Sequence, residues 1–214
     1  MNTQTLAAQL ASRHQPVKPI PFGRICLEWA SVTAISFAAL VFYYGGFRAD
    51  LSARLLEPLF TAEIALNFLL VVVAGLSATA CAYPDRARTR MHQILLWIVF
   101  TGYSAIFLMA AFHRPDLAGP ASGHEPHGLE CLQCLLAFAI IPACWMSWRL
   151  RQLACVKPMQ MGFTAILMAM ATGGLGVRLL ESGHLQDGLM LTHYLPILLL
   201  SGAGLLLGGK FFRW

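Results

Sequence analysis

Charged side chains are scarce in this chain. Asp, Glu, Lys and Arg together make up only 12% of the 214 residues, whereas 57% of the residues are hydrophobic. The few charges gather in short clusters between long apolar runs, which is typical of a chain solvated by lipid. The composition therefore excludes an ordinary water-soluble domain.

Sequence motifs of the common soluble enzymes are missing as well. No Ser-His-acid arrangement, phosphate-binding glycine loop or dinucleotide fingerprint occurs in a suitable context. The net charge of +5 does not indicate nucleic-acid binding, because the basic residues stand at the ends of apolar runs, where they would meet lipid headgroups. We therefore expect neither an enzyme nor a protein that binds nucleic acid.

Apolar segments of similar length follow one another along most of the chain. Each is close to the ~20 residues that a helix needs to cross a bilayer. They predict an all-α polytopic membrane protein with six transmembrane helices at about 26–44, 61–83, 91–112, 129–148, 158–180 and 189–209. We expect residues 1–24 to form an N-terminal tail and residues 25–214 to form the transmembrane domain.

The tail combines a short amphipathic stretch with a proline-rich stretch. Leu6 and Leu10 stand one helical turn apart, and three prolines between 16 and 21 prevent the helix from continuing. No small-residue cleavage site follows the first apolar run promptly, so we expect no removable signal peptide.

Lys and Arg counts predict the orientation, because basic residues are retained on the cytoplasmic side. With the N-terminus inside, eleven of the 15 basic residues fall on the cytoplasmic side and four, namely Arg48, Arg54, Arg114 and Arg178, fall on the other side. The sequence therefore predicts a protein of a bacterial inner membrane with both termini in the cytoplasm.

Small residues are concentrated in the last two predicted spans. The fifth contains Gly173, Gly174 and Gly176, and the sixth contains Gly202, Gly204 and Gly208. Because packing drives helix association in lipid, such residues let two helix backbones approach closely. We favour tight packing inside the bundle over self-dimerisation.

Polar side chains within the spans are costly in hydrocarbon. We expect Glu63 and Asn67, one turn apart in the second span, to face the bundle interior or a wet vestibule. Glu28 and Arg178 lie near span ends, and we expect their side chains to extend to the interface. No series of intramembrane carboxylates or histidines crosses the membrane, so a metal or small-solute transporter is less favoured.

A group of cysteines and histidines stands at the start of the fourth span. Cys131 and Cys134 are three residues apart, so a helix would bring both thiols to one face. In an oxidising compartment they could form a disulfide or react with an oxidant. Alternatively, His127, Cys131 and Cys134, with His124 and a distant histidine such as His184, could bind zinc, copper or another thiophilic metal. A third interpretation is that both cysteines only pack as small apolar residues.

Several short motifs then resemble those of one family. They are Gly46–Leu51 after the first span, Pro58–Phe60 before the second, Glu130–Cys134 opening the fourth and Gly209–Trp214 at the end. In order and placement they are similar to the NrsF-type membrane anti-sigma factors, and the similarity covers nearly the whole chain.

The resemblance implies a negative regulator that sequesters an extracytoplasmic-function sigma factor and releases it on metal or oxidative stress. By analogy, Cys131 and Cys134 would be the sensing residues, and the tail with Leu6, Leu10 and Arg13 would contact the sigma factor. Family members often carry a further cysteine between the last two spans, where this chain has Ser182. A disulfide between the two outer loops therefore cannot form here.

A membrane thiol-disulfide oxidoreductase is the alternative from another class. Such an enzyme would pass electrons from external thiols to quinone. It would need a second redox-active pair on the outer side, and the sequence offers none there.

Overall fold

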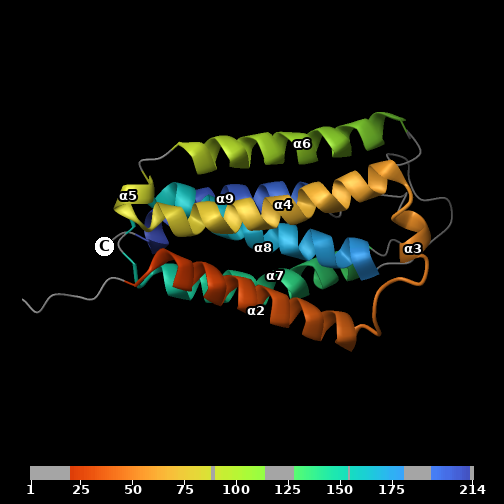
Figure 1. The fold of residues 1–214 in the computed structure, drawn as a ribbon, viewed down its shortest axis with the longest axis horizontal. Helices are drawn as coiled ribbons and strands as arrows, with labels where there is room; N and C mark the ends of the chain where they lie inside the picture. Colours follow the sequence, from red (N-terminus) through yellow and green to blue (C-terminus); the bar gives the residue numbers. More distant parts are fainter. Residues whose placement is uncertain (1–19, 88–89, 114–127, 154, 181–193, 213–214) are drawn as a thin grey trace, which may run out of the picture.

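The computed structural model describes residues 20–87, 90–113, 128–153, 155–180 and 194–212, and all regular structure within these ranges is helical. The long helices lie side by side along the longest axis of the molecule (Figure 1). The helices are α2 (Phe22–Tyr43), α3 (Leu51–Arg54), α4 (Pro58–Cys81), α5 (Pro84–Ala87), α6 (Met91–His113), α7 (Gly128–Leu150), α8 (Pro158–Leu180) and α9 (Leu195–Phe211).

Five of these helices, α2, α4, α6, α7 and α8, are long and apolar enough to cross a membrane. The prediction of helices throughout is confirmed for the described residues, and five of the six predicted spans are long and apolar enough to cross a membrane. The remaining apolar helix, α9, has 17 residues, which corresponds to roughly 26 Å at 1.5 Å per residue and falls short of a ~30 Å hydrocarbon core. The sixth span and the orientation of the termini therefore stay predictions.

Prolines explain where several helices begin. Proline is favoured in the first helical turn, since its missing N–H would have no partner there. The first helix begins directly after Pro21, so it starts at Phe22 and not near residue 26 as predicted. Pro58 likewise begins α4 three residues before the predicted start, and Pro158 begins α8 at the predicted position.

The helix α8 occupies the centre of the bundle. It packs against α9, α4 and α7, while α2 packs on α7 and α4, and α6 packs mainly on α4. Figure 1 shows α6 along one edge of the bundle and α2 along the opposite edge. We call the end at which α6 and α8 begin the basic end, and the opposite end, which carries α3, the α3 end.

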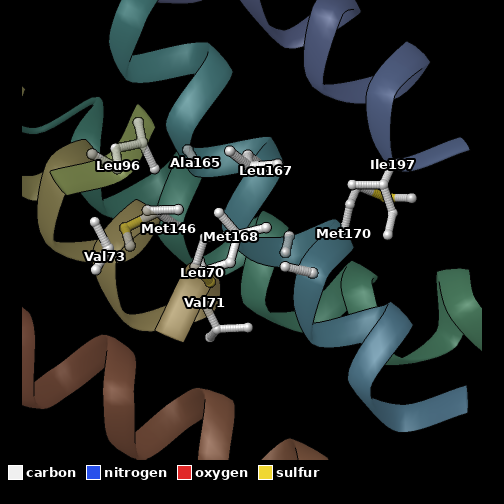
Figure 2. Close-up of a cluster of buried hydrophobic side chains, with 14 of the residues drawn as sticks. Leu70, Val71, Val73, Leu96, Met146, Ala165, Leu167, Met168, Met170 and Ile197 are labelled. Atoms are coloured by element: carbon white, nitrogen blue, oxygen red, sulfur yellow. The ribbon is translucent and has the colours of Figure 1, made fainter. Parts of the chain in front are cut away.

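The buried core lies between α4 and α8. Figure 2 shows Leu70, Val71 and Val73 of α4 together with side chains of α8, joined by Leu96 of α6, Met146 of α7 and Ile197 of α9. Methionine is unbranched and fills irregular gaps between helices. Most of the α4 and α8 surface is therefore withdrawn from lipid, whereas α2, α6 and α7 expose most of theirs.

Glycines set the contact between α8 and α9. A Cβ atom added to Gly162 of α8 would lie 2.2 Å from the Gly204 carbonyl oxygen and 2.6 Å from the Gly208 Cα of α9. The two backbones are therefore in direct contact, as the predicted internal packing requires. Gly202 behaves differently, because a Cβ there would meet nothing within 4 Å.

Glycines also set the contacts of α8 with α7 and of α4 with α2. A Cβ on Gly173 would lie 2.3 Å from the Leu135 carbonyl oxygen, and one on Gly176 would lie 2.6 Å from the Phe138 ring. On α4, a Cβ at Gly75 would lie 2.7 Å from the Trp29 ring of α2. Because glycine has no side chain, each of these positions leaves room for a neighbour's backbone or aromatic ring.

Pro142 lies buried in the middle of α7. Proline has no N–H to donate to the carbonyl of the residue four positions earlier, and its ring crowds that carbonyl. The hydrogen-bond ladder of α7 is thus interrupted between its first half, which carries Cys131 and Cys134, and its last turn, which carries Arg149.

We predict that Gly162→Ala destabilises the bundle, because the new methyl group cannot fit against the α9 backbone. Overpacking of this kind costs about 1–3 kcal/mol, so the apparent melting temperature of the detergent-solubilised protein should fall. Gly202→Ala is the matched control and should leave the melting temperature unchanged or raise it, since alanine favours helix more than glycine. Equal melting temperatures for the two variants would contradict the contact.

Candidate functional site

A buried ion pair joins α4 to α8 near the α3 end. The Arg178 guanidinium donates hydrogen bonds to both carboxylate oxygens of Glu63, at 2.7 Å and 2.5 Å. Only 13% of the Arg178 side chain and 8% of the Glu63 side chain are exposed. Glu63 therefore faces the bundle interior as predicted. The expectation that Arg178 extends to the interface is wrong, because a buried carboxylate on the neighbouring helix attracts it.

A second arginine, Arg48, approaches the same place from the turn after α2. Its side chain is only 3% exposed and donates to both oxygens of Asp50, at 2.5 Å and 2.8 Å. Both arginines contact the Phe60 ring, whose centroid is 5.9 Å from the Arg48 guanidinium carbon and 5.1 Å from that of Arg178. We call this group the α3-end charge cluster; its members are Arg48, Asp50, Phe60, Glu63 and Arg178.

Backbone geometry holds Arg48 in the cluster. Gly45 and Gly46 have φ angles of +87° and +103°, a conformation that glycine adopts without strain, and they end α2 abruptly. The Arg48 N–H then donates to the Leu179 carbonyl oxygen of α8 at 3.1 Å. The turn between α2 and α3 is thereby joined to the same end of α8 as the ion pair.

Asp50 remains ionised in this arrangement. The hydrogen bonds from Arg48 hold the pKa of Asp50 at about 2, below its ordinary value. Arg54 also contacts Asp50, at 3.4 Å, and pairs with Glu57 at 3.0 Å. These outer contacts are more exposed than the Glu63–Arg178 pair and contribute less to stability.

Asn67 extends the polar contacts of α4 one turn deeper into the bundle. It is fully buried, and its amide lies between Ala171 and Leu175 of α8. In the amide orientation that satisfies both groups, the nitrogen donates to the Ala171 carbonyl oxygen and the oxygen accepts from the Leu175 N–H, both at 3.1 Å. Asn67 therefore faces the interior as predicted, and its hydrogen-bonding groups are satisfied within the protein.

Aromatic residues connect α6 to the segment that leads into α9. The Tyr194 ring stacks on Phe107 at a centroid distance of 4.9 Å, and its hydroxyl donates to the Ser104 hydroxyl at 2.5 Å. Tyr103 is fully buried beside both rings. Most other contacts of α6 are with α4. The contacts with Tyr194 therefore help to position the second half of α6, which lies near the α3 end.

Cys131 and Cys134 lie in the first turns of α7, and both are half-buried. Cys134 packs against the hydrophobic core, and the next residue, Leu135, touches Gly173 of α8 through its carbonyl group. One turn further, Phe138 packs on Gly176, two residues before Arg178. The helix that carries the cysteines therefore contacts the segment of α8 that leads to the ion pair.

The other residues of the predicted sites lie outside the described part of the chain. They are the possible metal ligands His124, His127 and His184 and the tail residues Leu6, Leu10 and Arg13. Among the residues that are described, no group of three or more His, Cys, Asp or Glu side chains could hold a metal ion.

At the basic end, Glu28 of α2 pairs with Arg24 at 2.8 Å and with Arg149 of α7 at 3.0 Å. The expectation that Glu28 extends to the interface did not include its ion pair with a neighbouring helix.

In the connection from α7 to α8, burial raises the pKa of the Cys155 thiol. A thiol protonated at neutral pH reacts slowly, which agrees with a packing role for this cysteine.

Two members of the charge cluster, Arg48 and Asp50, were missed as site residues by sequence reasoning. They stand in the Gly46–Leu51 motif, a short turn between spans to which the sequence analysis assigned no chemical role. A usable signal was the glycine pair at 45 and 46 followed within four residues by two opposite charges, since such a turn can fold back on the helix ends.

Comparison with known proteins gives one family. The family model described as "NrsF: Negative regulator of sigma F" matches residues 10–214, which is nearly the whole chain. No curated protein and no solved structure matches.

We predict that Arg178→Gln strongly destabilises the protein, because it leaves the Glu63 carboxylate buried without its partner. Breaking such a pair costs about 3–5 kcal/mol, which should appear as a large drop in the apparent melting temperature in detergent. The double variant Glu63→Gln with Arg178→Gln should recover part of the loss, since no buried charge remains. Arg54→Gln is the control at a more exposed ion pair, with an effect of about 0–1 kcal/mol. Similar effects for Arg178→Gln and Arg54→Gln would contradict the role of the buried pair.

Proposed function

This chain belongs to the NrsF family of negative regulators of sigma F, and we propose that it sequesters an extracytoplasmic-function sigma factor at a bacterial inner membrane and releases it on metal or oxidative stress. The observation that carries the proposal is the family match over residues 10–214. The five apolar helices agree with a membrane location, and a family of regulators suggests a role other than catalysis.

The proposed topology has six spans with both termini in the cytoplasm. The basic end supports it, because Arg24, Arg86, Arg149, Arg151, Lys157 and Lys210 all lie there. Basic residues are retained on the cytoplasmic side of bacterial membranes. In this topology the α3 end and the two cysteines of α7 face the external compartment.

The proposed contact with the sigma factor is the tail, residues 1–24. Leu6 and Leu10 would form its apolar face and Arg13 would add a charge. An amphipathic helix of this kind binds a partner by laying its apolar face in a groove. The tail leads directly into α2, whose first turns pair with α7 through Glu28 and Arg149.

The proposed sensor is the Cys131 and Cys134 pair. On a regular helix, Cβ atoms three residues apart are about 5–6 Å from each other, whereas a disulfide needs about 3.8 Å. Forming the disulfide would therefore distort the first turn of α7. The distortion would act on Leu135 and Phe138, which touch Gly173 and Gly176 of α8.

Binding of a thiophilic metal ion is the second form that the signal could take. Zinc or copper would be held by the two thiols with His124, His127 and His184 as further ligands. Cysteine thiolates and imidazoles are the ligands that such metals prefer. Metal binding and disulfide formation would constrain the same turn of α7.

The energy available at the sensor is of the size that a switch needs. Shifting a two-state equilibrium from 1:99 to 99:1 requires about 5.5 kcal/mol of difference between the states. A well-coordinated metal ion can supply this much, a disulfide closing so short a loop supplies about 2 kcal/mol, and an exposed ion pair supplies about 1 kcal/mol or less. The sensor is therefore better placed at the thiols than at the exposed charges of α3.

We predict that Leu6→Asp with Leu10→Asp releases the sigma factor, because the two carboxylates would prevent burial of the apolar face. In cells, transcription from promoters of the sigma factor that co-purifies with the wild-type protein should rise without stress, and that sigma factor should no longer co-purify with the variant. Ala8→Asp is the control, since position 8 of such a helix lies opposite Leu6 and Leu10, so that the charge is added outside the apolar face. Retained co-purification of the double variant would contradict the tail contact, and failure of the wild-type protein to bind the sigma factor would contradict the proposed function itself.

We predict that Cys131→Ser with Cys134→Ser abolishes induction by an oxidant or a thiophilic metal ion while repression without stress persists. A sigma-dependent reporter measures both states. Cys144→Ser is the matched control, because Cys144 lies on the same helix, is exposed, and is distant from the first turns of α7. Full induction of the double variant would rule out sensing at this pair.

A further inference from the structure

A cleft of about 230 Å³ separates α6 from α8 and α9 in the half of the bundle near the basic end. The helix α4 closes its floor with Ser77 and Cys81. Leu96 and Trp97 of α6, Phe163 of α8 and Leu205 of α9 line its walls. Both hydroxyl groups in the lining are already bonded to backbone carbonyl oxygens, Ser77 to that of His92 and Thr164 to that of Gln160. The interior of the cleft is therefore suited to hydrocarbon.

The cleft reaches the lipid-facing surface of the bundle. Two of its wall residues, Trp97 and Leu205, are 56% and 37% exposed, and α6 lies at the edge of the bundle (Figure 1). The Trp97 ring stacks on Phe163 across the cleft, at a centroid distance of 6.2 Å. An acyl chain of the surrounding bilayer could therefore enter between α6 and the α8–α9 pair without unfolding either.

A polar bridge and two cations lie toward the basic end of the cleft. The Gln93 side chain of α6 donates to the Gln160 side chain of α8 at 2.8 Å. Arg90 precedes Gln93 by three residues and Lys157 precedes Gln160 by three residues. Because α6 and α8 both begin at the basic end, each cation stands one helical turn from the bridge, on the headgroup side of the cleft.

The position of Lys157 is fixed by the end of α4. The N–H of its neighbour Val156 donates to the Cys81 carbonyl oxygen at 3.3 Å, and Cys81 lines the cleft. The backbone just before Lys157 is thus bonded to a residue that lines the cleft.

From these observations we propose that the cleft binds one anionic phospholipid, with an acyl chain between α6 and the α8–α9 pair and the phosphate near Lys157 and Arg90. An apolar slot with cations at its headgroup end favours an anionic amphiphile over a zwitterionic one, because the ammonium group of the latter offsets the charge of its phosphate. Basic pockets between transmembrane helices at the cytoplasmic side bind anionic lipid headgroups for this reason. The proposal goes beyond the regulatory function and does not depend on the sigma factor.

Native mass spectrometry of the purified full chain measures this preference. The detergent-solubilised protein is mixed with equal amounts of phosphatidylglycerol and phosphatidylcholine of the same chain length, and one phosphatidylglycerol should stay bound in preference. Arg90→Gln with Lys157→Gln should weaken that preference by roughly fivefold for each cation removed. Arg24→Gln with Arg151→Gln, which removes two charges from the same end outside the cleft, should leave it unchanged. Equal retention of the two lipids, or equal loss in both double variants, would overturn the proposal.

Fluorescence quenching in bilayers tests the acyl-chain position separately. Phosphatidylglycerol with brominated chains should quench tryptophan fluorescence more than brominated phosphatidylcholine does. Trp97→Phe should remove this difference between the lipids while keeping an aromatic ring in the cleft wall. Trp148→Phe is the control, because Trp148 is also largely exposed but does not line the cleft. If the difference persists in Trp97→Phe, or is absent from the wild-type protein, the chain does not occupy the cleft.

Discussion

The close approach of α8 to its neighbours is the constraint on which the bundle depends. In lipid, exclusion of apolar surface from water does not drive helices together, so the bundle depends on packing and on polar contacts. Gly162 brings α8 against α9, and Gly173 and Gly176 bring it against α7. The central helix therefore has small residues where it meets α9 and α7, while its larger side chains, such as Leu167 and Met168, fill the core. A third face, toward α4, is held differently.

Between α4 and α8 the contact is fastened by polar groups. Glu63 bonds to Arg178, and Asn67 bonds to the α8 backbone one turn deeper. Each group would be costly in hydrocarbon alone. Together they favour a single register of the two helices, because sliding either helix by one residue would separate these partners. The glycine contacts thus determine how closely α8 approaches its neighbours. The polar contacts determine its register relative to α4.

Much of the fold follows from the sequence because its signals are local. Apolar length predicted five of the spans, and prolines account for the shifts at their starts, as at Phe22. The inward position of Glu63 and Asn67 followed from the cost of polar groups in lipid. The partners could not be predicted in the same way. Arg178 lies 115 positions from Glu63, and Gly162 has no motif around it, so both contacts can be predicted only once the order of helices in space is known.

The sigma contact and the sensing thiols came from resemblance to a family, and the predicted histidine ligands and tail residues lie outside the described ranges.

Pro142 gives α7 a mechanical property that its neighbours lack. Because Pro142 cannot donate a backbone hydrogen bond, bending α7 at its middle costs less energy than bending it elsewhere. The first half is seated on the glycines of α8, whereas the last turn is tied to α2 by Arg149 and Glu28. A movement of one half of α7 would therefore change the angle between its two halves at Pro142, and would not shift the whole helix along its axis.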